Sequence, residues 1–159
     1  MPDENEQSTP GLPTKGQQSD YGELIAKDAF IEAITIFGDE AQTAGNYGYI
    51  FTARVPLEII GVAEIHETAS SAAGTLQVYK VATATAIAYG VALLATAFNL
   101  QSTANVAVLK QGKDLSVVRG SRFVKTGESI GIKTTGTLAD LIGVCVTVYF
   151  KIAHKGNYK

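Results

Sequence analysis

Ser129 is the residue whose surroundings most resemble a catalytic motif. It lies in Gly127-Glu128-Ser129-Ile130-Gly131, which matches the G-x-S-x-G elbow of α/β-hydrolases, where a strained strand-to-helix turn exposes the serine hydroxyl. Asp140 and His154 follow in the order that a triad of that fold requires. Together these residues define one hypothesis, a hydrolase with a serine nucleophile.

The residues after Ser129 favour a strand over an elbow. Ile130 and Ile132 continue a period-two pattern, and Thr134-Thr135-Gly136 follows where the elbow needs a helix. The chain also has no repeating βαβ pattern and is short for that fold. We therefore predict that Ser129 is an outward-facing strand residue.

A metal site is conceivable at Glu64-Ile65-His66-Glu67. The zincin motif H-E-x-x-H is not met, because Ser70 stands where the second histidine is needed. Glu64 and His66 would share one face of a strand, but the sequence identifies no third ligand. We expect a hydrogen-bonded histidine at a strand end instead.

No other residue carries a convincing site. Cys145 lies in a strand pattern, on the face opposite the aliphatic residues, with no neighbouring base that would activate a thiol, so we predict a small packed residue. Neither glycine-rich phosphate-binding pattern occurs in the chain. We assign no catalytic, cofactor-binding or metal-binding residue and expect a protein that is not an enzyme.

Composition argues against nucleic acid and membrane as partners. The net charge of −2 gives no strong field, and lysines and arginines are scattered rather than clustered with aromatic residues. Residues 81–109 lack charge, but polar residues and alanines interrupt the run too often for a membrane span. A single cysteine excludes an intrachain disulfide and is compatible with assembly in a reducing cytoplasm, and the N-terminus does not resemble a secretory signal.

Charge and composition divide the chain into three parts. Residues 1–28 hold six acids and two lysines, a net charge of −4, and form an extended acidic arm with a possible short helix at 20–28. Such an arm is typical of a tail that docks on a neighbour or of a solubilising tail. Residues 29–153 form the domain, and residues 154–159 form a basic C-terminal tip.

Residues 29–153 predict strands separated by turns rich in glycine, serine and asparagine. The expected strands include 57–67, apolar on both faces and so covered on both sides, 75–81 with Leu76 and Val78 inward, and 128–133 with Ile130 and Ile132 on one face. Short strands are expected at 105–110, 115–118 and 121–125, and residues 91–98 fit either helical turns or an irregular strand. Strict alternation predicts a final strand over 142–152. The fold class is all-β, an antiparallel β-sandwich of the jelly-roll type.

Several blocks of sequence between residues 57 and 150 resemble a group of small tailed-phage virion proteins. They are Ile60–Ala69, Ala73–Val78, Gly90–Leu94, Phe98–Leu100, Ser102–Asn105, Thr126–Ile132 and Gly136–Val148. The resemblance implies a β-sandwich that assembles into the virion on the outer capsid surface, and these blocks are shared by cement, head-fibre and tail components. Our leading hypothesis is a decoration or cement protein that binds the major capsid protein. The resemblance carries no catalytic residue over to this chain.

We expect a homotrimer on the virion, assembled in the host cytoplasm, because the decorations that the sequence resembles form trimeric caps. The alternative is a receptor- or glycan-binding module of a phage head or tail fibre. Clustered exposed aromatics at one loop end, drawn from Tyr47, Tyr49, Tyr79 and Tyr89, would favour that alternative.

Overall fold

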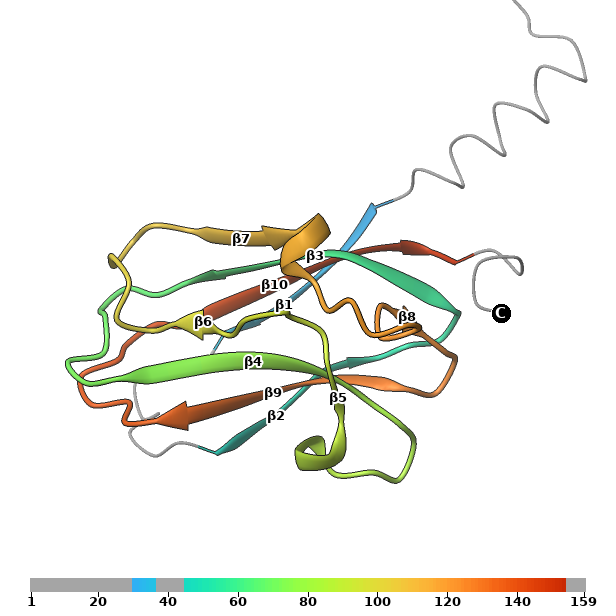
Figure 1. The fold of residues 1–159 in the computed structure, drawn as a ribbon, viewed down its shortest axis with the longest axis horizontal. Coiled ribbons are helices and arrows are strands. Elements are labelled where there is room, and N and C mark those ends of the chain that lie inside the picture. Colours follow the sequence, from blue (N-terminus) through green and yellow to red (C-terminus); the bar gives the residue numbers. More distant parts are fainter. Residues whose placement is uncertain (1–29, 37–44, 154–159) are drawn as a thin grey trace, which may run out of the picture.

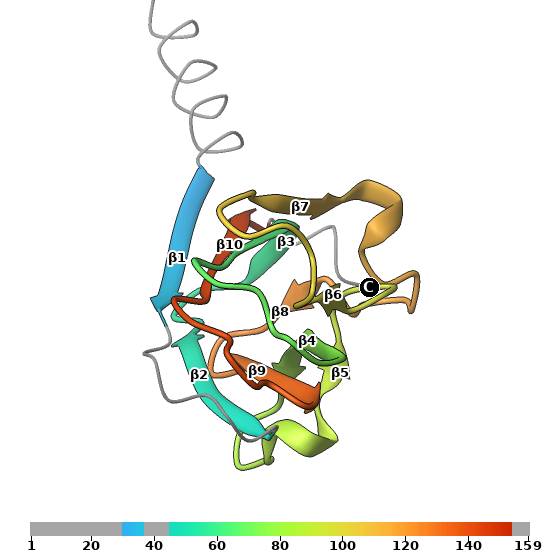
Figure 2. The ribbon, with the colours of Figure 1, turned by 90° about the vertical axis from the view of Figure 1, so that its left-hand side faces the viewer.

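The computed structural model describes residues 30–36 and 45–153, which form two antiparallel sheets packed face to face (Figures 1 and 2). The expected arm, the possible helix at 20–28 and the basic tip lie outside the described residues. One sheet has the order β1-β10-β3-β7, with the short β8 pairing β3. Its strands are β1 (Phe30–Ile36), β10 (Cys145–Ile152), β3 (Leu57–Ile65), β7 (Val108–Gln111) and β8 (Phe123–Val124).

The second sheet has the order β2-β9-β4-β5, with the short β6 pairing β4. Its strands are β2 (Asn46–Thr52), β9 (Ser129–Gly136), β4 (Gly74–Val81), β5 (Val91–Ala92) and β6 (Phe98–Asn99). Two 3₁₀ turns, η1 (Ile87–Tyr89) and η2 (Gly112–Asp114), complete the elements.

The pairing order is that of a jelly-roll. The first strand pairs the last, the second pairs the one before it, and this nesting continues inward, with β3 on β7 and β4 on β5. The chain crosses between the two sheets from β1 to β4, stays in the second sheet through β5 and β6, and returns to the first with β7 and β8 before β9 and β10 cross again, as in a long hairpin rolled into a sandwich. The predicted fold class, an all-β jelly-roll sandwich, is confirmed.

The core is aliphatic and comes from the alternate residues of both sheets. Leu76 and Val78 of β4 and Ile130 and Ile132 of β9 are fully buried, as their alternation predicts. Phe51 and Phe150 link the sheets, with ring centroids 5.0 Å apart. Among the described residues no helix is long and apolar enough to cross a membrane.

The final strand begins later than predicted. β10 begins at Cys145, three residues after the expected start at Ile142. Gly143 has φ +66° and Asp140 has φ +63°, so the chain turns before the strand although its hydropathy already alternates. Ile142 pairs only with Thr68, in an isolated bridge.

The segment 82–125 is less regular than predicted. Residues 91–98 are not helical, and β5 and β6 cover its two ends. The strand expected at 115–118 is absent from this described stretch, where Leu115 makes one isolated bridge to Leu94. The strand expected at 105–110 begins and ends later, as β7 (Val108–Gln111), and the strand expected at 121–125 is reduced to β8 (Phe123–Val124). Hydropathy cannot locate these ends, because they depend on partners that lie far away in the chain.

β3 carries a bulge that reverses its alternation. Ile59 pairs Phe150 and Gly61 pairs Tyr149, so Ile60 is an extra residue without a partner in β10. Before the bulge Leu57 and Ile59 face the core, and after it Val62 and Glu64 do. The bulge therefore explains why apolar residues stand at both odd and even positions of β3. The outward residues of this strand are half-buried, so β3 is not covered on both sides as predicted.

Candidate functional site

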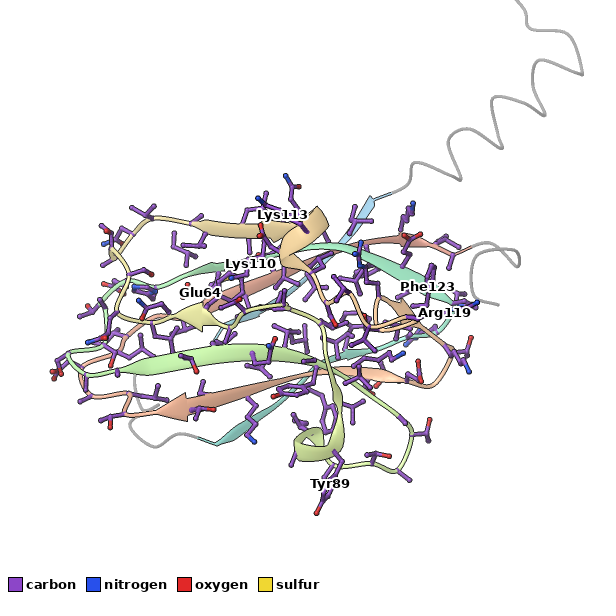
Figure 3. All side chains as sticks on the ribbon, in the orientation of Figure 1. Glu64, Tyr89, Lys110, Lys113, Arg119 and Phe123 are labelled. Carbon is purple, nitrogen blue, oxygen red and sulfur yellow. The ribbon has the colours of Figure 1, made fainter. Side chains whose placement is uncertain are left out.

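The buried polar cluster at the end of β3 contains Glu64 and His66. Glu64 lies between Val146 of β10 and Val108 of β7, and its side chain is fully buried. Without the bulge at Ile60, the period of two would turn Glu64 outward. His66 follows β3 directly and its side chain is also fully buried. Figure 3 shows Glu64 within the sandwich.

His66 uses both ring nitrogens. Its Nε2 donates to the Ser102 carbonyl at 3.0 Å, since a carbonyl can only accept, and its Nδ1 lies 2.8 Å from Glu64 Oε1. Asn105 adds two bonds from the same loop: its backbone N donates to the His66 carbonyl at 2.8 Å, and its side-chain Nδ2 donates to the Glu67 carbonyl at 3.1 Å. The pair therefore fastens residues 99–105 to the end of β3, as expected of a hydrogen-bonded strand-end histidine.

One proton between Glu64 and His66 makes the pair neutral overall. Burial raises the pKa of Glu64 above its ordinary value, and the hydrogen bond and charge of His66 oppose this only in part. With Nε2 committed to Ser102, a proton on Glu64 can be donated to Nδ1.

The cluster does not have the composition of a metal centre. In residues 30–36 and 45–153 no group of three histidine, cysteine, aspartate or glutamate side chains lies together in a way that could hold a metal ion. Glu64 Oε2 and Ser102 Oγ are buried without a hydrogen-bond partner, and both belong to this cluster. A buried water is the usual partner for such atoms, and burial separates the pair from any substrate in solution.

Ser129 lies at the first position of β9, within a ladder. It pairs Val81 of β4 and Thr52 of β2, and its Oγ lies 2.8 Å from Thr52 Oγ. Gly127 takes φ +86° in the turn before β9, but a strand follows, not a helix. Asp140 is exposed at the other end of β9, and His154 lies outside the described residues. The structure does not bring Ser129 and Asp140 together.

Cys145 is half-buried at the beginning of β10, paired with Ile36 and Ile65. Among the described residues its thiol makes no hydrogen bond or ion pair. A reactive thiol needs an electropositive setting, and this strand position does not supply one.

The segment 106–125 gathers exposed charge and exposed apolar side chains. It contains five basic residues and one acid, Asp114, which gives a net charge of +4. Three of the bases are exposed, Lys113, Arg119 and Lys125, whereas Lys110 and Arg122 are half-buried, with Lys110 Nζ 5.2 Å from the centre of the Phe98 ring. Figure 3 labels Lys110, Lys113 and Arg119 over β7, η2 and the turn before β8. Val106, Leu109, Val117 and Val118 are exposed in the same segment. We call the exposed residues of this segment the 106–125 surface.

The turn 116–121 holds two valines out in solvent. Val117 is 84% exposed and Val118 is 60% exposed, whereas Leu115, Ser116 and Ser121 on either side are buried. Ser121 N donates to the Val118 carbonyl at 3.0 Å, and Arg122 Nε donates to the Ser116 carbonyl at 3.3 Å. The exposed valines therefore belong to a hydrogen-bonded turn.

Lys80 of β4 anchors this turn from the opposite sheet. Its Nζ donates to the Gly120 carbonyl at 2.8 Å and to the Phe123 carbonyl at 3.0 Å. Burial lowers the pKa of Lys80, Glu128 opposes the shift, and Lys125 adds to it. Because these partners lie about 40 residues away, sequence reasoning missed the anchor.

Comparisons with known proteins leave the family open. No protein-family model matches the chain, and no curated protein matches it. A chain from the structure of infectious bursal disease virus, Gx strain, matches with 14% identity and a TM-score of 0.27. The match covers 81% of this chain and 38% of the viral chain.

Proposed function

We propose that the chain is a non-enzymatic structural protein of a tailed-phage virion, which decorates or cements the outer capsid surface as a homotrimer. It binds the major capsid protein through residues 1–28 and the edges of the sandwich. The resemblance of residues 57–150 to such virion proteins supports the proposal, and so does the jelly-roll order, a scaffold that capsid and lectin domains share.

The observation that carries the proposal is the hydrogen-bonded turn 116–121. Large apolar side chains held in solvent on an ordered backbone carry a solvation cost that contact with a partner removes. Preorganisation also lowers the entropy lost on binding. In contrast, the buried Glu64–His66 pair contacts the chain's own loop, so the polar cluster contributes to the fold and not to chemistry on a substrate.

Particle binding tests this function. Phage particles that lack the protein are incubated with the purified chain and sedimented. We expect the full chain to sediment with the particles at a fixed ratio, and a variant without residues 2–19 to remain folded but to bind more weakly. Absence of the full chain from the pellet contradicts the proposal, and equal binding by both chains contradicts the role of the arm. Light scattering tests the trimer separately.

A receptor- or glycan-binding role is the second candidate, because two exposed tyrosines lie beside one loop. Tyr89 is 82% exposed at η1 and points away from the domain (Figure 3), and Tyr49 is 53% exposed. Tyr49 Oη donates to the Thr85 carbonyl at 3.1 Å, which places it against the same loop. Tyr79 is half-buried, and the side chain of Tyr47 is not described. Exposed aromatic faces suit sugar rings, so a glycan array with the wild type and Tyr89→Ala separates this role from decoration.

A further inference from the structure

Opposite charges are segregated in this chain. Residues 1–28 carry −4 and residues 106–125 carry +4, with Lys113, Arg119 and Lys125 exposed. The part of the acidic segment nearest the domain also has apolar residues between its acids: Tyr21, Leu24 and Ile25 lie among Asp20, Glu23 and Asp28. The 106–125 surface has the complementary composition, with Val117 and Val118 exposed beside its bases.

Strand register places the beginning of β1 close to this surface. Phe30 pairs Lys151, Lys151 pairs Glu58, and Glu58 pairs Phe123 of β8, so the four residues form one row across the sheet. Three strand spacings separate Phe30 from Phe123, about 15 Å. Figure 1 shows the beginning of β1 and β8 toward the same end of the sandwich.

A short stretch of chain spans that distance. An extended residue covers about 3.3–3.6 Å, so about five residues before Phe30 reach the 106–125 surface of the same molecule. Covalent connection raises the local concentration of the acidic segment at this surface to about the millimolar range, which favours the molecule's own segment over that of another copy.

We propose that residues 1–28 dock on the 106–125 surface of their own chain in the free protein. The acids meet Lys113 and Lys125, and the apolar residues of 20–28 cover Val117 and Val118. The proposal goes beyond decoration, because it makes the free protein a masked form whose apolar turn is shielded until a partner displaces the acidic segment.

Paramagnetic relaxation in the full-length chain tests the contact. A nitroxide is attached at Ser8→Cys in a chain that also carries Cys145→Ser, and broadening of amide resonances is measured. We expect broadening over residues 106–125 when label and isotope are on the same chain. We expect it to disappear when they are on different chains in a mixture, and in about 1 M NaCl, where the screening length falls to about 3 Å.

Matched charge reversals locate the surface. Lys113→Glu should reduce the broadening, whereas Lys133→Glu on β9 of the other sheet should leave it unchanged. Three results overturn the proposal: no broadening over 106–125, broadening confined to residues 154–159, or broadening that persists in the mixed sample, which would indicate a second copy. The experiment uses the free protein, so its failure is separate from failure to bind particles.

Discussion

The two ends of the sandwich use hydrogen bonds in opposite ways. At the His66 end, formed by turns 66–73, 99–105 and 137–143, side chains turn inward and bond to neighbouring backbone. Ser70 Oγ lies within bonding distance of the Ala72 carbonyl at 2.8 Å and the Thr137 carbonyl at 3.1 Å, and His66 holds Ser102. Polar groups here fasten loops together, and little apolar surface is left over.

At the β8 end, formed by residues 82–90 and 112–128, the same kind of bond has the reverse result. Lys80 Nζ and the backbone fix the turn 116–121 so that Val117 and Val118 lie in solvent. An ordered backbone therefore does not by itself show that a segment stabilises the fold. Where ordered backbone buries its side chains it stabilises the fold, and where it exposes valines it prepares a contact.

The largest expected effect is at the His66 end. His66→Leu leaves Glu64 buried without its partner and frees the Ser102 carbonyl, so the free energy of unfolding should fall by about 3–5 kcal/mol. Chemical denaturation measures the loss. The double variant Glu64→Leu with His66→Leu removes both buried polar groups and should be more stable than His66→Leu alone. A loss below about 1 kcal/mol in His66→Leu would show that the pair does not hold the loop.

The next effect is at Gly136, in the same end of the sandwich. It has φ +90°, and a Cβ there would lie 2.2 Å from the Ala73 carbonyl oxygen. Gly136→Ala should destabilise by about 1–3 kcal/mol from backbone conformation, and steric overlap adds to this. Gly112→Ala is the control, because Gly112 has φ +57° with open space around it, so only a conformational cost of about 1–2 kcal/mol applies. Equal losses in thermal stability would contradict the tight packing.

These residues also show what the sequence can predict. Alternation identified the long strands of the core, because Leu76, Val78, Ile130 and Ile132 need only a period of two and burial on one face. The start of β10 was predicted wrongly, since Gly143 breaks the backbone and not the hydropathy pattern. Glu64 and His66 both face inward only because of the bulge at Ile60. The sequence does not indicate this bulge, because it lies within a run of apolar residues.

The sequence does not predict the 106–125 surface, for a different reason. The spacing of the bases in the sequence does not group them. They lie along one edge of the sheet because β3 pairs with both β7 and β8. The exposure of Val117 and Val118 depends on Lys80, which belongs to another strand and another sheet. Such information is held in long-range pairing, which local patterns do not contain.

A smaller effect should appear in the pH dependence of stability. The pKa of Glu64 is raised by burial above 4.5, so the unfolded chain releases this proton before the folded chain does. Its contribution to stability is complete below about pH 4.5 and is lost as the pH rises through the folded pKa. Glu64→Gln cannot titrate, and its amide can donate to His66 Nδ1. As the pH rises above about 4.5, the denaturation midpoint of Glu64→Gln should increase relative to that of the wild type. A constant difference between the two midpoints at every pH would contradict a raised pKa of Glu64.

The smallest effect on stability is expected at the β8 end. Val117→Ser with Val118→Ser removes exposed apolar side chains, so the free energy of unfolding should change by no more than about 0.5 kcal/mol per site. Particle binding should nevertheless weaken, because the removed area is what a partner would cover. The control is Val55→Ser, an exposed valine of the β2–β3 connection outside the 106–125 surface. Unchanged sedimentation of the double variant with particles would show that this turn is not the contact, and would move the search to the opposite edge, at β1 and β2.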